Sequence, residues 1–311
     1  ATMSAVRLAR GYTGRDVVVK FAGNYHGHVD SLLVAAGSSA ATLSVPNSPG
    51  VTPGTSQDTL VLEFNDCQAL EDAFMAHGDR IAGVIMEPVV GNMGCVPASS
   101  EFLATARRLT HDAGSLLILD EVMTGFRVAY GGAQEFYGVT PDMCTLGKAV
   151  AGGFPLSAVA GSADIMEHFA PSDPDAPFVM QEGTFNGNPI GSVAGLATLK
   201  VLRREGTYER LFATGNRLKE ALTRLLYEAE MPAQVVGEAP MFDVIFTDHK
   251  ITNYRSILDR DQPKVMRFTE LLRERGIFKN HGKYYVSTTH GDAEVEQTIS
   301  AWKSALEALD I

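Results

Sequence analysis

Between residues 16 and 161 the chain alternates between short apolar runs and helix-length segments of periodic polarity. Near-continuous apolar strands separated by helices are typical of a mainly parallel sheet that helices cover on both faces. Such sheets bind ligands beyond the carboxyl ends of their strands, so residues that follow strands are the candidates for a functional site. The predicted strands are 17–21, 60–64, 81–86, 116–120, 143–146 and 156–160, and the predicted helices are 66–77 and 99–113.

The pattern changes after Pro189, where longer amphipathic helices and short strands follow one another. Helices are predicted at 190–204, around 211–225 and at 264–275, with strands at 233–236, 242–246 and 284–287. The last helix is amphipathic, with Trp302 on its core face, and we expect Asp292 to cap its N-terminus. The chain is thus predicted to form a large α/β domain over residues 1–205 and a smaller α+β C-terminal domain over 206–311.

Composition narrows the class of protein. The 311 residues are 45% hydrophobic and 20% charged, which is ordinary for a globular chain. A net charge of −11, without basic runs interleaved with aromatics, argues against nucleic acid as a partner. The apolar runs are too short to span a membrane. The three cysteines are widely spaced, which favours a reducing, cytoplasmic location.

Two segments stand apart from the alternation. The chain begins within a helical pattern and without an initiator Met or a targeting segment, so we expect further sequence upstream.

Residues 34–56 form a long stretch of small residues and turn formers between two strands. Loops of this length in compact domains are often functional, and we interpret this one as an active-site lid.

Opposite charges end two of the predicted strands. Asp120 closes the run 116–120, and Lys148 follows 143–146 after Gly147. A charge at the end of a buried apolar strand is energetically costly unless it is paired with an opposite charge or binds a ligand. The two residues therefore form an ion pair, or they hold pyridoxal 5'-phosphate (PLP), whose ring nitrogen needs a carboxylate and whose aldehyde needs an amine. Spacing alone leaves both interpretations open.

Further motifs surround this pair, in the order 21–28, 47–51, 86–93, 120–128, 131–134, 146–148, 152–155 and 183–189. Together they resemble the class III, fold type I PLP-dependent aminotransferases, and within them most closely the glutamate-1-semialdehyde 2,1-aminomutases. The resemblance covers nearly the whole chain. It implies the fold type I transferase architecture, a PLP-binding large domain over 1–205, and small amino acid and keto acid substrates.

The resemblance also implies individual roles. Lys148 would form the Schiff base with PLP and then act as the base that moves a proton. Asp120 would hold the ring nitrogen, with Val122 against one ring face and Tyr25 stacked on the other. Thr184 would reach the cofactor phosphate of a neighbouring subunit, which implies a homodimer.

The resemblance also concerns further residues of the motifs. His26 is expected near the cofactor, and Asn92 is expected to hydrogen-bond near its phenolic oxygen. Glu87 and Arg127 lie in matched motifs, where structural ion pairing explains them equally well. The family's phosphate-binding Ser-Gly-Thr loop and a substrate-binding arginine belong to the upstream sequence that we expect.

One departure from the pattern concerns the reaction. The aminomutases carry a glutamate shortly before a Phe-Val-Ser-Leu-Ala-His block, where it engages a substrate amino group. Here Gly282 and Lys283 occupy that neighbourhood, ahead of residues 285–290. A lysine suits a substrate carboxylate better than an amine. We therefore predict an intermolecular aminotransferase, with the true aminomutase, which makes 5-aminolevulinate, as the alternative.

A different class of protein has to be weighed as well. His26, His28 and Asp30 follow a strand with the spacing of metallo-β-lactamase-like zinc hydrolases. The next ligand position is Ser31, and the other histidines form no supporting cluster. A catalytically inactive homologue that acts as a dimeric binding protein is a third possibility.

Overall fold

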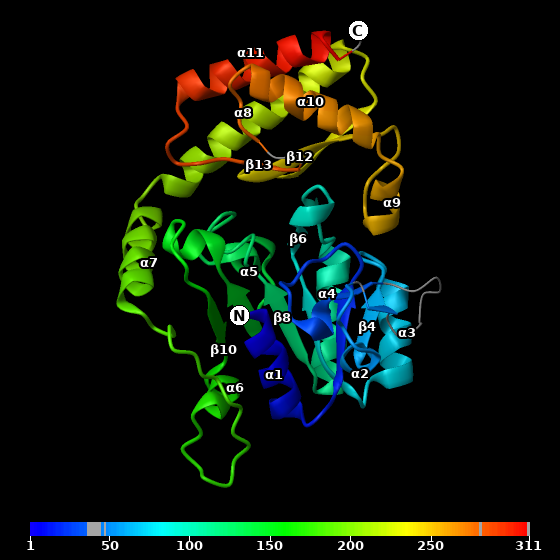
Figure 1. Ribbon diagram of the computed structural model, residues 1–311, viewed down its shortest axis with the longest axis vertical. Helices are drawn as coiled ribbons and strands as arrows, with labels where there is room; N and C mark the ends of the chain where they lie inside the picture. Colours follow the sequence, from blue (N-terminus) through cyan, green and yellow to red (C-terminus); the bar gives the residue numbers. More distant parts are fainter. Residues whose placement is uncertain (36–44, 47, 280–281, 310–311) are drawn as a thin grey trace. The chain divides into compact units, whose positions relative to one another are not determined.

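The computed structural model describes residues 1–35, 45–46, 48–279 and 282–309 (Figure 1). Contacts divide the chain into two compact units. Unit 1 comprises Ala1–Pro88 and Ala98–Val201, and unit 2 comprises Val89–Pro97 and Leu202–Ile311. Residues 89–97 thus group with the C-terminal part of the chain. Whether the chain folds as two domains divided at residue 206 stays a prediction.

The centre of unit 1 is a six-stranded sheet of order β10-β9-β8-β5-β1-β4. All neighbouring strands are parallel except β10, which runs antiparallel to β9. This confirms the predicted α/β class with a mainly parallel sheet. The strands are β1 (Val17–Phe21), β4 (Thr59–Leu62), β5 (Ile81–Met86), β8 (Leu116–Asp120), β9 (Met143–Leu146) and β10 (Ala158–Gly161).

Helices cover both faces of this sheet (Figure 1). On one face α1 packs Ala5 and Leu8 against Ile85 and Ile118. On the other, Phe102 of α4 meets Phe21 of β1 edge to face. The helices are α1 (Thr2–Thr13), α2 (Pro53–Ser56), α3 (Cys67–His77), α4 (Ser100–Ala113), α5 (Gly132–Tyr137), α6 (Ala163–Met166) and α7 (Pro189–Leu202), with 3₁₀ turns η1 (Asp30–Leu32), η3 (Lys148–Ala151) and η4 (Glu167–Phe169).

The predicted lid, residues 34–56, lies partly outside the described residues. Its described parts are α2 and the two short strands β2 (Val34–Ala35) and β3 (Val45–Pro46), which pair antiparallel. The function of this segment as a lid stays a prediction.

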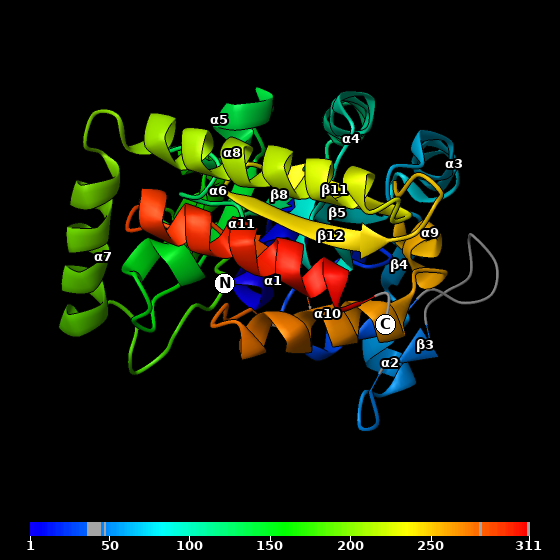
Figure 2. The same cartoon turned by 90° about the horizontal axis from the view of Figure 1, so that it is seen from above.

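Unit 2 contains a three-stranded antiparallel sheet of order β11-β12-β13. Figure 2 shows α8, α11 and α10 side by side over this sheet. Trp302 of α11 is fully buried among them, as expected for a core residue, and its Nε1 donates to Oη of Tyr284 at 3.0 Å. The elements are β6 (Val89–Val90), η2 (Gly91–Met93), β7 (Val96–Pro97), α8 (Thr207–Glu228), β11 (Ala233–Glu238), β12 (Met241–Phe246), α9 (Tyr254–Leu258), α10 (Gln262–Glu274), β13 (Tyr284–Tyr285) and α11 (Asp292–Glu307).

The expected cap of the last helix is wrong by one residue. Gly291 is the N-cap of α11, and its backbone N–H donates to Oε2 of Glu294 at 2.8 Å. Asp292 is the first helical residue, and its carboxylate accepts from Arg217 at 2.6 Å instead. The side chain that we expected to cap the helix therefore forms a surface ion pair instead.

In the part of the chain that the structure describes, no helix combines the length and apolar character that crossing a membrane requires.

Candidate active site

The carboxyl ends of four neighbouring parallel strands meet at one edge of the unit 1 sheet. Tyr25 and His26 follow β1, Glu87 follows β5, Asp120 ends β8, and Lys148 follows β9. The chain turns from β1 outward to β4 and then back to β5 on the other side, so the strand order reverses here. This reversal is the place where open α/β sheets bind their ligands.

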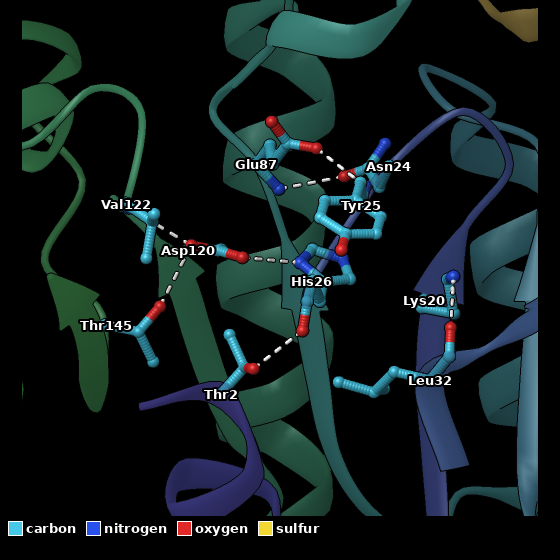
Figure 3. A network of polar contacts seen from close by, with 10 residues as sticks. All are labelled: Thr2, Lys20, Asn24, Tyr25, His26, Leu32, Glu87, Asp120, Val122 and Thr145. Carbon is cyan, nitrogen blue, oxygen red and sulfur yellow. Dashed lines mark hydrogen bonds and ion pairs between the residues drawn. The ribbon is translucent and has the colours of Figure 1, made fainter. Parts of the chain in front are cut away.

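Asp120 is the best-defined member of the site (Figure 3). Although it ends a strand, only 3% of its surface is exposed. Its Oδ1 accepts from the hydroxyl of Thr145 at 3.0 Å and from the backbone N–H of Val122 at 3.1 Å. Its Oδ2 lies 2.7 Å from Nδ1 of His26. A carboxylate offers about four acceptor positions, so three donors leave room for one more.

The surroundings of Asp120 favour its charged form. Burial alone would raise the pKa of this carboxyl, because it disfavours the anion. The hydrogen bond and the charge of His26, together with the hydrogen bonds from Val122 and Thr145, outweigh burial and hold the pKa below its ordinary value. The site therefore presents a buried, oriented carboxylate anion.

The loop after β1 is fastened to the end of β5 by two backbone contacts (Figure 3). The backbone N–H of Glu87 donates to Oδ1 of Asn24, and the backbone N–H of Tyr25 donates to Oε1 of Glu87, each at 2.8 Å. Glu87 is buried, and the side chain of Tyr25 is 51% exposed. The loop thus holds an accessible aromatic ring on a fixed backbone, the arrangement that a stacking residue needs.

Lys148 is the first residue of η3, and its side chain is exposed. Its backbone is left-handed, with φ of 44°, which turns the chain sharply at the strand end. A Cβ added at Gly147 would lie 3.3 Å from Cγ1 of Val122. Gly147 therefore lets the segment before Lys148 pack closely on Val122.

Lys20, on β1, contributes a buried amine that the sequence interpretation did not single out (Figure 3). Its Nζ donates to the carbonyl oxygens of Leu32 at 2.9 Å and Val34 at 3.4 Å. Burial lowers the pKa of Lys20 to about 8, although the negative charge of Glu87 opposes the shift. The amine thereby ties the segment that precedes the predicted lid to the sheet.

The remaining predicted residues belong to other segments of the chain. Thr184 is exposed in the irregular segment before α7. Asn92 belongs to unit 2, where its Oδ1 accepts from Nζ of Lys283 at 2.8 Å. Lys283 also donates to the carbonyl oxygen of Gly91 at 3.0 Å. The structure therefore joins Asn92 to the lysine that marks the departure from the aminomutase pattern.

Besides Lys20, two further contributors were missed from the sequence. Thr145 is a polar residue in an otherwise apolar strand, directly paired in register with Asp120. Asn24 was passed over as part of a loop, yet it orders the backbone beside Tyr25. A polar residue one strand away from a functional acid is the signal that would have identified Thr145.

The zinc alternative has no support in the structure. His26 is buried against Asp120, whereas His28 and Asp30 are exposed. Within the described ranges, no group of three or more His, Cys, Asp or Glu side chains is arranged to hold a metal ion.

The residues at the sheet edge fit PLP. Asp120 keeps one acceptor position and a negative charge for a protonated ring nitrogen, and an exposed primary amine follows the neighbouring strand. Tyr25 and Val122 supply an exposed aromatic ring and a half-buried aliphatic side chain. These side chains suit a pyridine ring that carries an aldehyde, and they do not form the ligand set of a metal ion.

Architecture and site together define a fold type I PLP-dependent transferase. The family model for class III aminotransferases matches residues 1–302, and the chain belongs to this family, whose members are PLP-dependent enzymes. The expected family, fold type, enzyme class and cofactor are thus confirmed.

The similar proteins include both aminomutases and aminotransferases, the two reactions between which the sequence interpretation had to choose. A glutamate-1-semialdehyde 2,1-aminomutase of Rhodopirellula baltica is 51% identical, covering 99% of this chain and 70% of that protein. Among solved structures, an omega-transaminase from Sphaerobacter thermophilus is 35% identical with a TM-score of 0.94, covering 100% of this chain and 72% of that one. A transaminase with PLP bound is 30% identical with a TM-score of 0.88, covering 99% and 70%.

Proposed function

We propose that the protein is an intermolecular aminotransferase that moves an amino group between an amino acid and a keto or aldehyde acceptor. The observation that supports the chemistry most is the anionic, three-donor carboxylate of Asp120 beside the strand that leads to Lys148. When bound, PLP supplies an electron sink for the electrons released as a substrate C–H bond is broken.

The chain's own residues divide the remaining tasks. Asp120 would hold the protonated ring nitrogen of the cofactor, and the amine of Lys148 would hold its aldehyde end. When free, the same amine would serve as the general base that moves a substrate proton. Val122 and Tyr25 would confine the ring from its two faces.

The choice of aminotransferase over aminomutase rests on residues 282 and 283. In place of a carboxylate for a substrate amine, this neighbourhood holds the ammonium of Lys283, positioned by Gly91 and Asn92. An ammonium repels a substrate amine and attracts a carboxylate. For Asn92, the predicted hydrogen bond to the cofactor's phenolic oxygen would come from its amide N–H groups, because Oδ1 is engaged by Lys283.

Two measurements test this function. Purified protein loaded with PLP should be yellow, and borohydride should fix the cofactor covalently on Lys148, which peptide mass spectrometry locates; Lys148→Ala should abolish both. With substrates, amino transfer should require a separate keto or aldehyde acceptor. Turnover of glutamate 1-semialdehyde to 5-aminolevulinate without any added acceptor would overturn the aminotransferase assignment in favour of the aminomutase.

We infer a homodimer, with Thr184 acting on the neighbouring subunit's cofactor. Large apolar side chains are exposed on both sides of Thr184, and Phe185 beside it is 81% exposed. Along α7, Ile190, Val193 and Leu196 add an exposed apolar stripe. Contiguous exposed apolar surface of this kind is typical of subunit interfaces.

We also propose a cytoplasmic location. Among the described residues Cys67, Cys95 and Cys144 form no disulfide, and the last two are buried. Free cysteines are characteristic of reducing compartments.

A further inference from the structure

A buried acid and a buried amine lie together in unit 2, close to Lys283. Asp243 interrupts the apolar strand β12, and only 6% of its surface is exposed. Lys279, in the loop after α10, is 6% exposed as well. Its Nζ lies 3.5 Å from Oδ1 of Asp243 and 4.5 Å from the ring centre of Tyr284. The two residues form a buried ion pair, an interaction that is costly to break by removing one partner.

Lys283 is a second lysine beside the same acid. Phe242 and Tyr284 pair in register across β12 and β13, which are antiparallel. The next residues on one side of this pair are Asp243 and Lys283. The charge of Lys283 accordingly acts on the carboxyl of Asp243. One acid therefore faces two lysines, and a single carboxylate can compensate the charge of only one of them.

We propose that Lys279 is a positioning residue for substrate specificity: it engages Asp243 and so leaves the positive charge of Lys283 available to a substrate carboxylate. The inference deepens the proposed function, because it rests on the role given there to Lys283. It defines the substrate class as amino acids or acceptors whose side chain ends in a carboxylate. Lys279 acts through Asp243 and needs no contact with the substrate itself.

The three side chains together carry one net positive charge. Burial raises the pKa of Asp243 and lowers the pKa of Lys279, and the attraction between the two groups opposes both shifts. Whichever of the two holds the shared proton, the pair is neutral overall. The remaining charge belongs to Lys283, whose Nζ donates to the uncharged carbonyl of Gly91 and amide oxygen of Asn92. These contacts orient the ammonium without cancelling its charge, and that charge matches a single carboxylate.

Removing Lys279 should redirect Asp243. A buried carboxylate that has lost its partner is costly, so it would pair with the ammonium of Lys283 instead. A substrate carboxylate would then meet a pair of zero net charge. Removing the carboxylate as well should restore recognition, since Lys283 again carries the one net charge of the three positions.

The test compares how tightly the PLP-loaded protein binds glutarate and pentanoate, which differ only at the distal carbon. Titration calorimetry at about pH 8, where an ordinary carboxyl is ionised, gives the preference for the dicarboxylate as a ratio of dissociation constants. Lys279→Met should lower this preference by about 10-fold. Combining Lys279→Met with Asp243→Asn should return it to within about 3-fold of the parent protein.

Asp243→Asn alone leaves both lysines and should keep or increase the preference, and it serves as the test if Lys279→Met does not fold. A preference that falls in Asp243→Asn, or that the double variant does not restore, would mean that the pair only supports the fold and would overturn the inference. If Lys283→Met keeps the parent preference, the role proposed for Lys283 fails. If Lys283→Met loses the preference and Lys279→Met retains it, only the inference on Lys279 fails.

Discussion

The ammonium of Lys283 lies 2.8 Å from Oδ1 of Asn92, across 191 residues of sequence. With the carbonyl of Gly91 as a second acceptor at 3.0 Å, two of the three N–H donors of this amine are engaged. A lysine held in this way is a fixed positive charge rather than a mobile surface group, which makes it suitable for recognising an anion.

Replacing Lys283 should therefore change substrate binding more than turnover. We expect Lys283→Met to raise KM for an amino acid or keto acid with a side-chain carboxylate by about 10-fold, since it removes a charge-assisted contact, with a smaller effect on kcat. Steady-state kinetics with acidic and neutral substrates would measure this. Lys303→Met, at an exposed position on α11, is the matched control. Unchanged KM values for acidic substrates would contradict a carboxylate-binding role.

The proposed contribution of Thr184 across the dimer can be tested by subunit mixing. Lys148→Ala should be inactive, and Thr184→Ala should bind PLP weakly. In a mixed dimer, one site combines the intact Lys148 of one chain with the intact Thr184 of the other, so activity should reappear when the two variants are exchanged into one dimer. No recovery, despite mixed dimers shown by mass spectrometry, would mean that Thr184 serves its own subunit or none.

Thr145 should influence how the protein responds to acid. A carboxyl whose pKa is depressed by folding contributes stability at neutral pH, and this contribution is lost as the pH falls through its folded pKa. The hydroxyl of Thr145 is one of the donors that depress the pKa of Asp120. Thr145→Val should thus lower the free energy of unfolding by about 1–2 kcal/mol near neutral pH. The difference from wild type should shrink in acid.

Denaturant unfolding at a series of pH values would measure this effect. Thr145→Ser, which keeps the hydroxyl, should follow the wild type at every pH. A Val variant whose deficit is the same at low and neutral pH would show a packing effect instead of a lost donor.

Lys20 should produce a trend of the same sign at alkaline pH. Its pKa falls from 10.5 to about 8 on folding, so between these values the unfolded chain binds more protons and stability rises with pH. The rise should approach roughly 3 kcal/mol relative to Lys20→Met, which lacks the titrating amine. Unfolding free energies of the two chains between pH 7 and 10 would show it. A constant difference across that range would be inconsistent with a buried, shifted amine.

Much of the fold could be predicted from the sequence because runs of apolar residues mark the buried segments. Strands β1, β5, β8 and β9 have the predicted bounds, since each is a near-continuous apolar run between polar residues. The strand predicted at 156–160 is observed at Ala158–Gly161 and runs antiparallel, a direction that a hydrophobic pattern does not encode. The pairing of β6 with β7, and their grouping with unit 2, escaped prediction because two-residue strands have no periodicity.

The site was predicted unevenly for a similar reason. Asp120 and Lys148 stand out because each interrupts or ends an apolar strand. The partner of Asp120 does not stand out, because His26 is 94 residues away and any of the strand-end side chains is a candidate from sequence alone. Which of them meets Asp120 depends on the sheet order, which places β1 two strands from β8 with β5 between them.

The three donors to Asp120 also have a meaning for folding. They come from the loop after β1, from the backbone just beyond β8 and from β9, at sequence separations of 94, 2 and 25 residues. Closing the two longer loops, of 94 and 25 residues, is slow and entropically costly, so the cluster can be complete only after distant segments have docked. A chain that is still folding, or that has locally opened, therefore lacks the oriented Asp120 carboxylate that the ring nitrogen requires. Cofactor capture at this site would select fully assembled molecules and, by mass action, protect them from unfolding.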